Sequence, residues 1–297
     1  MWSVPSERII SNQPIIGNVS TLLIRYAEIG LKSAPVRKRF ENQLKDNILT
    51  MLMEDGVEAL VNKKGARYYV EATDPEAAVR SVRKVFGVAS ISVAEVCGSS
   101  MEEMCAAAAE YSKGRLSEGQ SFAVKARREG SQSYTSMDVG REVGSAIFIA
   151  NEHLGIKVDL TDPDVVFFVE VRDNMAYIFQ DYIRCHAGLP VGSQGKVIAI
   201  ADDDRGLVSA WLMMKRGCRV ALRGESYLEL LRQYDPLMRS VGPDYVAKNT
   251  FGYVLGTRME EVGKVDVSEY NLPVFFPTAG MTDEEVSQLA EAIRNGL

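Results

Sequence analysis

The order of apolar and polar positions divides the chain into three segments, each with its own pattern of elements. In the first, residues 20–96, an apolar strand at 21–26 precedes a helix whose apolar residues recur at every fourth position from Val36 to Ile48. A hairpin, a helix that runs from Pro75 to Phe86 and a strand at 88–96 complete a βαββαβ order. This order predicts a ferredoxin-like fold, with two helices on one face of a four-stranded antiparallel sheet.

The middle of the chain predicts a second unit of helices and strands. An alanine-rich helix at 101–113 precedes an alternating strand at 121–126, and we expect the polar residues 127–135 to form a loop. A helix follows from 136 to about 154, and two paired strands lie between 165 and 182.

The last third of the chain follows a glycine-rich connection at 185–195 and contains a βαβ unit. Val197–Ala201 is short, apolar and β-branched, as a buried parallel strand requires, and Leu207–Lys215 strongly favours a helix. A second strand begins at Val220, and a helix is expected from Ser226 to Leu237. Strands and helices then alternate up to a final helix that Thr282 caps. Such alternation predicts a parallel α/β sheet.

The turn inside this βαβ unit decides whether the domain can hold a nucleotide. Anions bind at the helix N-terminus of such units, where glycines let free amides approach the phosphate. Here the turn contains three carboxylates and a basic residue, in the order Asp202-Asp203-Asp204-Arg205-Gly206. The carboxylates would cap the helix but repel a pyrophosphate. Because no other ligand pattern lies nearby, we interpret them as capping groups and expect no metal site.

Composition disfavours several classes of protein. The 297 residues are 46% hydrophobic without an apolar run of membrane-spanning length, and the first residues lack a signal-peptide pattern. The four cysteines form no CxxC or CxxH pair, so we expect free thiols in a reducing cytoplasm. The net charge of −6 disfavours a broadly basic nucleic-acid binder, so RNA would need local basic patches. Residues 1–18 read as a polar extension.

Two basic clusters lie at strand ends and helix starts, where a fold can bind a phosphate backbone without reading sequence. They are Arg37-Lys38-Arg39 and Lys125-Ala126-Arg127-Arg128, with Arg141 on the helix after the second cluster. From the residues alone, an ordinary solvated surface also explains both clusters.

The histidines and cysteines do not define a catalytic group. Cys185 and His186 could form a nucleophile pair, but neighbours in sequence rarely face one another. We expect His153 to be structural near a helix end and Cys218 to be buried at a strand start.

Several motifs, in the same order, resemble the tRNA 4-thiouridine synthetases, also called thiamine-biosynthesis sulfurtransferases. Residues 25–32 (RYAEIGLK) with Arg39-Phe40 are similar to the opening of that family. The segments that resemble its THUMP domain are 122–128, 136–144, 158–160 and 162–165. Residues 188–196 resemble its interdomain link, and residues 211–217 resemble the helix after its pyrophosphate (PP) loop. Two segments, 272–274 and 280–285, resemble its C-terminal part.

The resemblance implies α+β and α/β architecture in consecutive parts. These are an extension at 1–18, a ferredoxin-like domain at 19–96, a THUMP RNA-binding domain at 97–187 and a truncated PP-loop-like α/β domain at 188–297. The first two domains of that family bind the acceptor end of tRNA, which makes the basic clusters expected RNA contacts. Active relatives adenylate a uridine with ATP and replace its oxygen with sulfur carried on a cysteine.

The chain departs from the family where the chemistry takes place. Active members have a serine-glycine-glycine-x-aspartate-serine loop in place of residues 201–206, and the loop aspartate is replaced by Arg205. The third domain is shortened between Glu225 and Thr250, and no cysteine follows Cys218 to carry sulfur. We therefore predict a cytoplasmic protein that binds the acceptor end of tRNA, without catalytic residues or a cofactor.

Two alternatives stay open. One is an active tRNA sulfurtransferase of 4-thiouridine or thiamine synthesis that uses ATP and Mg²⁺ and is completed by a partner subunit. The other is a protein-interaction or regulatory module whose α/β domain binds a partner or forms a homodimer. Exposed aromatic residues expected around Phe275-Phe276 would suit the second alternative, although core packing explains them equally well.

Overall fold

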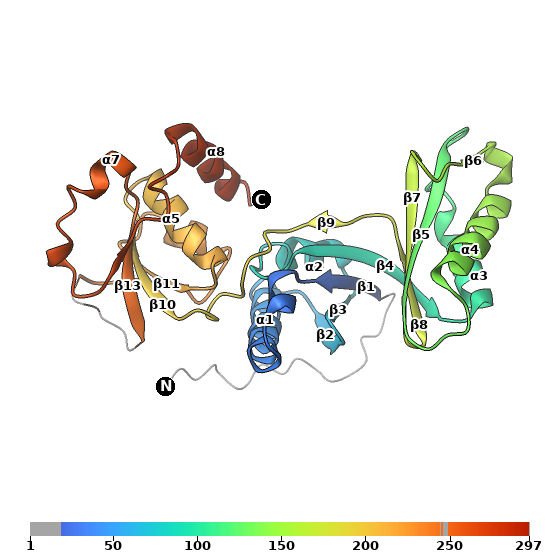
Figure 1. Cartoon of the computed structure of the whole chain (residues 1–297), viewed down its shortest axis with the longest axis horizontal. Helices are drawn as coiled ribbons and strands as arrows, with labels where there is room; N and C mark the ends of the chain where they lie inside the picture. The colour runs from blue at the N-terminus through green and yellow to red at the C-terminus, as the bar shows by residue number, and fades with distance from the viewer. Residues whose placement is uncertain (1–18, 244, 246–248, 297) are drawn as a thin grey trace. The chain divides into compact units, whose positions relative to one another are not determined.

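The computed structural model describes residues 19–243, 245 and 249–296, and its helices and strands are labelled in Figure 1. The predicted extension at 1–18 lies outside these residues. The chain divides into two compact units: the described residues of unit 1 fall in Ile24–Ile91 and Arg184–Leu297, and those of unit 2 in Asn18–Leu23 and Ser92–Ile183. No helix in the described part of the chain is both long and apolar enough to cross a membrane.

The first elements form the predicted ferredoxin-like arrangement. The strands are β1 (Ser20–Arg25), β2 (Ala59–Lys64), β3 (Arg67–Ala72) and β4 (Ser90–Gly98), in the sheet order β2-β3-β1-β4. The helices are η1 (Glu28–Leu31), α1 (Ala34–Glu54) and α2 (Pro75–Val82). The fourfold spacing correctly predicted the buried face of α1, which includes Phe40, Leu44 and Ile48.

Helix α2 ends four residues earlier than the sequence predicts. The prediction continued the helix to Phe86, but Arg83 is already its C-terminal cap. Phe86 is 1% exposed and packs against Trp211, with ring centroids 5.1 Å apart. Because Phe86 must leave the helix to reach this core, packing overrides the local helix preference.

Unit 2 packs two helices on one face of a sheet. The helices are α3 (Met101–Ser112) and α4 (Ser136–Ala150), followed by a short 3-10 turn η2 (Glu152–Leu154). The strands are β5 (Ser121–Glu129), β6 (Lys157–Val158), β7 (Val165–Arg172) and β8 (Met175–Phe179), in the order β4-β8-β7-β5-β6. Reciprocal capping boxes fix the starts of α3 and α4, at Ser100 with Glu103 and at Thr135 with Asp138.

The last part of unit 1 is a five-stranded parallel sheet, as predicted. Its strands are β10 (Lys196–Ile200), β11 (Arg219–Arg223), β12 (Arg239–Val241), β13 (Thr250–Leu255) and β14 (Val274–Phe275). All pair in parallel in the order β12-β11-β10-β13-β14, so β10 is central. The helices are α5 (Asp204–Lys215), α6 (Leu228–Arg232), α7 (Met259–Val262), η3 (Val267–Glu269) and α8 (Asp283–Arg294), while β9 (Ile183–Arg184) pairs with β4.

One expectation for this part is wrong in detail. Helix α6 was predicted to reach Leu237, but it ends at Arg232 because Tyr234 and Met238 turn into the hydrophobic core. Phe275 and Phe276, for which the sequence left exposure and core packing open, are half-buried, and Phe275 packs against that core.

Candidate functional site

The N-terminus of α5 directly follows the central strand β10, at the position where a nucleotide loop would bind phosphate. Helix α5 begins at Asp204, three residues before the predicted start, so Arg205 and Gly206 lie in its first turn rather than in a loop. The earlier start follows from capping, because Asp203 Oδ1 accepts a hydrogen bond of 2.7 Å from the Gly206 amide. That amide, which could bind a phosphate oxygen, is therefore already bound to a carboxylate.

The main chain after β13 lies against the same amide. A methyl group added at Gly256 would lie 2.3 Å from the nitrogen of Gly206, and one added at Gly206 would lie 2.7 Å from Cα of Ala201. A phosphate oxygen needs about 2.7–3.2 Å from each donor nitrogen and an open approach to it. The close backbone packing occupies the space through which a phosphate would approach.

Arg205 is buried, with 7% of its surface exposed, and serves groups of the chain itself. Its Nη1 donates to the carbonyl oxygens of Thr278 at 2.8 Å and Met281 at 3.2 Å. Its Nη2 donates to Asp283 Oδ1 at 2.7 Å. The guanidinium thus holds the segment before α8 against α5, and both of its Nη groups already donate to acceptors of the chain.

Asp283 links Arg205 to a second arginine. Arg258, which follows β13, donates to both carboxylate oxygens of Asp283 at 2.9 Å. Hydrogen bonds from Arg258 and then Arg205 lower the pKa of Asp283 to about 2. The carboxylate is therefore ionised at neutral pH and accepts hydrogen bonds from both cations.

Asp204 makes a further link between α5 and α8. Arg294 donates to both of its carboxylate oxygens, and the hydroxyl of Tyr227 donates to Oδ1 at 3.1 Å. The hydrogen bond from Arg294 is the main cause that lowers the pKa of Asp204. Three arginines around this helix start, Arg205, Arg258 and Arg294, are consequently paired with carboxylates of the chain.

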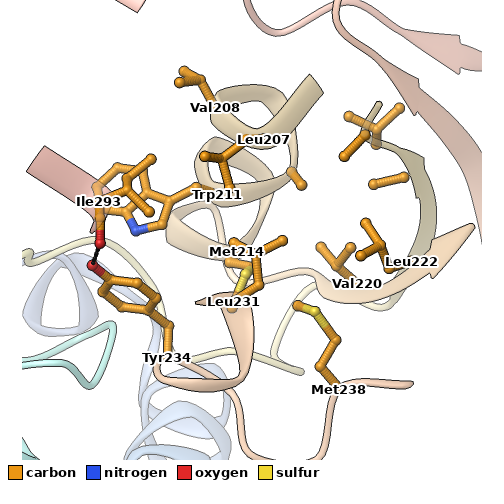
Figure 2. Close-up of a cluster of buried hydrophobic side chains, with 14 of the residues drawn as sticks. Leu207, Val208, Trp211, Met214, Val220, Leu222, Leu231, Tyr234, Met238 and Ile293 are labelled. Carbon is orange, nitrogen blue, oxygen red and sulfur yellow. Dashed lines mark hydrogen bonds between the residues drawn. The ribbon is translucent and has the colours of Figure 1, made fainter. Parts of the chain in front are cut away.

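A hydrophobic core supports this end of the domain (Figure 2). Trp211 and Met214 of α5 belong to one buried cluster with Leu222 of β11 and Ile293 of α8. The hydroxyl of Tyr234 donates to the carbonyl of Ile293 at 2.9 Å, shown as the dashed line in Figure 2. Because α5 and α8 share this core, the charged groups at their ends have a fixed position.

The predicted RNA-binding residues of β5 alternate between the two faces of the strand. Ala126 packs on the core of unit 2, whereas Lys125 and Arg127 are exposed. The prediction that a loop begins at Arg127 is wrong, since β5 continues to Glu129. Strand β7 runs beside it in register and supplies the hydrogen-bonding partners that extend the strand.

The cations of β5 remain available. Glu170 lies opposite Arg127 on β7, but its carboxylate is bound by Arg172 at 3.3 Å. Among the described residues, neither Lys125 nor Arg127 forms an ion pair, and Arg128 donates to a neighbouring carbonyl at 3.0 Å. This stretch therefore offers positive charge to a partner.

The other residues that were predicted to contact RNA lie on helices. Arg141 of α4 is exposed and pairs with acidic side chains of its own helix. Arg37 of α1 donates to two carbonyls of the preceding turn at 2.9 and 3.2 Å, while Lys38 and Arg39 are exposed. The α1 cluster belongs to unit 1, whereas β5 and α4 belong to unit 2.

Burial keeps the four thiols protonated. It raises the pKa of Cys97, Cys185 and Cys218 to about 11 and also raises the pKa of Cys105. It also lowers the pKa of His186 to about 4, where the imidazole contacts the rings of Phe86 and Trp211. Cys185 and His186 are thus both neutral at pH 7 and do not form a thiolate–imidazolium pair. Within the described residues, no group of three or more His, Cys, Asp or Glu side chains could hold a metal ion.

The sequence did not reveal the partners of the α5 turn. Tyr227, Arg258, Asp283 and Arg294 come from elements far along the chain, and nothing in their local pattern distinguishes them from solvated charges. The one available signal was the capping box at Thr282, which placed the start of α8 and with it Asp283.

Two domain families and several named relatives match the chain. Residues 21–92 match the ThiI ferredoxin-like domain and residues 98–181 the THUMP domain. Probable tRNA sulfurtransferases of Methanosarcina acetivorans and Methanocaldococcus jannaschii are 38% identical over 216 residues and 34% identical over 244 residues. The alignments cover 71% and 75% of this chain but 52% and 63% of the relatives, so the chain spans about half the length of the first.

Solved structures share the fold over nearly the whole chain. PH1313 from Pyrococcus horikoshii is 26% identical with a TM-score of 0.79, over 94% of this chain and 100% of that one. A 4-thiouridine synthetase in complex with RNA and bound ATP is 22% identical with a TM-score of 0.74, over 93% of this chain and 85% of that one.

Proposed function

The chain belongs to the tRNA sulfurtransferase family through its ThiI ferredoxin-like and THUMP domains, and from this premise we propose that it binds the acceptor end of tRNA without performing adenylation or sulfur transfer itself. The observation that carries the proposal is the state of the α5 N-terminus. Its amide is capped by Asp203, its approach is filled by Gly256, and its arginines are neutralised internally.

The recognition half of the proposal rests on unit 2. The exposed Lys125, Arg127 and Arg128 lie on a strand that a rigid sheet positions, which suits contacts to a phosphate backbone. Arg141 extends this surface on α4, and Arg37, Lys38 and Arg39 provide a second contact surface on unit 1. The related 4-thiouridine synthetase structure contains RNA, which supports tRNA as the partner.

The chemical half follows from electrostatics and geometry. Adenylation requires donors that already point at the developing charge on the phosphates. In this chain the Gly206 amide, Arg294 and Arg205 donate to Asp203, Asp204 and Asp283 instead. We therefore propose that the protein acts in the cytoplasm without binding ATP or Mg²⁺ at this helix start.

A gel-shift titration tests tRNA binding, with full-length tRNA and tRNA lacking its 3′ CCA end at near-physiological salt. The proposal predicts binding that weakens by at least about tenfold without CCA. Equal binding to both tRNAs and to an unrelated polyanion would reject acceptor-end recognition.

One observation favours a second candidate, an active sulfurtransferase completed by a partner. The alignments cover 52% and 63% of the relatives, and a separate subunit could supply groups that correspond to the unaligned part. Release of AMP from ATP distinguishes the candidates, because only the second predicts it.

A further inference from the structure

Unit 1 contains a hollow of about 520 Å³, which shares Arg294 with the group of charged residues at the α5 N-terminus. Helix α2, the turn after it and the end of α8 contribute to its lining. The basic side chains that line it are Arg80, Arg83, Lys84 and Arg294. Four cations at one hollow are unexpected in a chain whose net charge is −6.

The carboxylate at this hollow is already neutralised. Asp55 accepts a hydrogen bond of 2.6 Å from the hydroxyl of Ser81 and lies 3.9 Å from the ammonium of Lys84. Gln233 and Asn295 add amide groups to the lining. The surrounding polar groups are therefore mainly hydrogen-bond donors, as an anion requires.

Arg83 distinguishes the hollow from an ordinary basic surface. Arg80 has Glu76 at 3.9 Å, and Arg294 is bound to a carboxylate of α5. Arg83 is half-buried, and among the described residues it has no carboxylate within ion-pair distance. A partly desolvated cation without a counter-charge is unfavourable, and an anion bound beside it would compensate the charge.

We propose that this hollow binds a phosphate ester, with Arg83 as the anchor and Arg80 and Lys84 beside it. Guanidinium groups bind phosphate with two parallel hydrogen bonds, and the volume suits a nucleotide-sized group. Two sources share this chemistry, a free nucleotide and a backbone phosphate of RNA. The proposal goes beyond the tRNA-binding function and does not depend on it.

The test compares two probes, AMP by calorimetric titration and tRNA by gel shift, at about 0.15 M salt. The variants are Arg83→Gln and the double variant Arg80→Ala/Arg83→Ala. The matched control is Arg184→Ala/Lys264→Ala, which removes the same charge from exposed positions outside the lining. Circular dichroism melts confirm folding, and Arg83→Lys provides a milder variant that keeps the charge.

We expect Arg80→Ala/Arg83→Ala to lower the affinity for at least one probe by about tenfold or more. The affinities of the control variant should stay within about twofold of those of the wild type. Loss of AMP binding alone identifies a free nucleotide as the ligand, and loss of tRNA affinity alone identifies an RNA phosphate. If both affinities stay unchanged in a folded variant, or the control loses as much affinity, the proposal is overturned. If the wild-type protein does not bind tRNA in the gel shift, the proposed function is rejected, while the AMP titration still tests the hollow.

Discussion

The exposed strand β5 and the start of α5 use arginine in opposite ways. On β5, Lys125 and Arg127 extend from a sheet face without an ion pair among the described residues. At the start of α5, Arg205 makes hydrogen bonds to two carbonyls and a carboxylate and is buried. Positive charge is therefore available to a ligand on β5, whereas at the start of α5 it stabilises contacts within the chain.

The difference shows why counting basic residues does not identify an anion site. An arginine contributes to binding only when its donors and charge are not already satisfied by the fold. In this molecule, Lys125 and Arg127 on β5 form no ion pair among the described residues, while the residues at the start of α5 cross-link α5 and α8. Four variants, one of them compared with the wild type at several pH values, test this contrast.

Removing Arg205 should have the largest effect on stability. Arg205→Ala leaves the buried carbonyl of Thr278 without its donor and opens a gap between α5 and α8. We expect a loss of about 2–3 kcal/mol in the free energy of unfolding, measured by urea titration. The exposed Arg216→Ala serves as the control, and an equal effect of both substitutions would contradict the cross-link.

Removing the free cations should affect binding instead of stability. Arg127→Ala/Arg128→Ala should weaken tRNA binding by about tenfold and reduce the salt dependence by about two phosphate contacts. The midpoint of urea unfolding should stay near that of the wild type, since Arg127 makes no internal ion pair. Unchanged tRNA affinity across a salt series would argue against β5 as the contact surface.

Removing the cap of α5 should cost less than removing Arg205. Asp203→Ala loses the hydrogen bond to the Gly206 amide, and we expect a loss of about 1 kcal/mol in the free energy of unfolding. Gly256 still fills the approach to the amide, so ATP should not bind to this variant. Calorimetry with ATP checks this second expectation, and saturable binding would show that the carboxylate alone blocked the site.

The smallest expected effect concerns the pH dependence of unit 1. His186 has a folded-state pKa of about 4, below its ordinary value of 6.5, because burial disfavours the charged ring. Its contribution to stability is therefore complete above about pH 6.5 and decreases as the pH falls toward 4, since the unfolded chain then binds the extra proton. Between pH 7 and 5, the loss should be on the order of 1 kcal/mol after solvent screening.

Unfolding of His186→Leu beside the wild type at several pH values isolates this contribution. The leucine variant should lose less stability on acidification, because it has no imidazole to protonate. Parallel curves for the two proteins would show that His186 does not control the acid sensitivity.

The sequence predicted the layers of the fold because periodicity and capping are local signals. The stripe through Phe40 and Leu44 placed α1, and the Thr282–Glu285 box placed the start of α8. The prediction from sequence failed where contacts with a distant part of the chain decide where a helix or strand ends. Phe86 leaves the predicted helix to join a core around Trp211, and β5 continues through Arg127 because β7 lies beside it.

The candidate site was predictable only in part, for the same reason. The capping tendency of the three aspartates was visible, and Asp203 does cap α5. The burial of Arg205 was not visible, because its acceptors at Thr278 and Met281 and its partner Asp283 come from the far end of the chain. A charged residue in a turn is ordinarily exposed, and only tertiary structure makes it internal.

AMP release from ATP, measured with wild-type protein in the presence of a tRNA that it binds in gel shifts, tests the central claim most directly. The account predicts that tRNA is bound and that AMP formation does not exceed the rate without protein. Release of AMP that depends on both tRNA and protein would contradict the closed site at α5 and would make the active sulfurtransferase the better description.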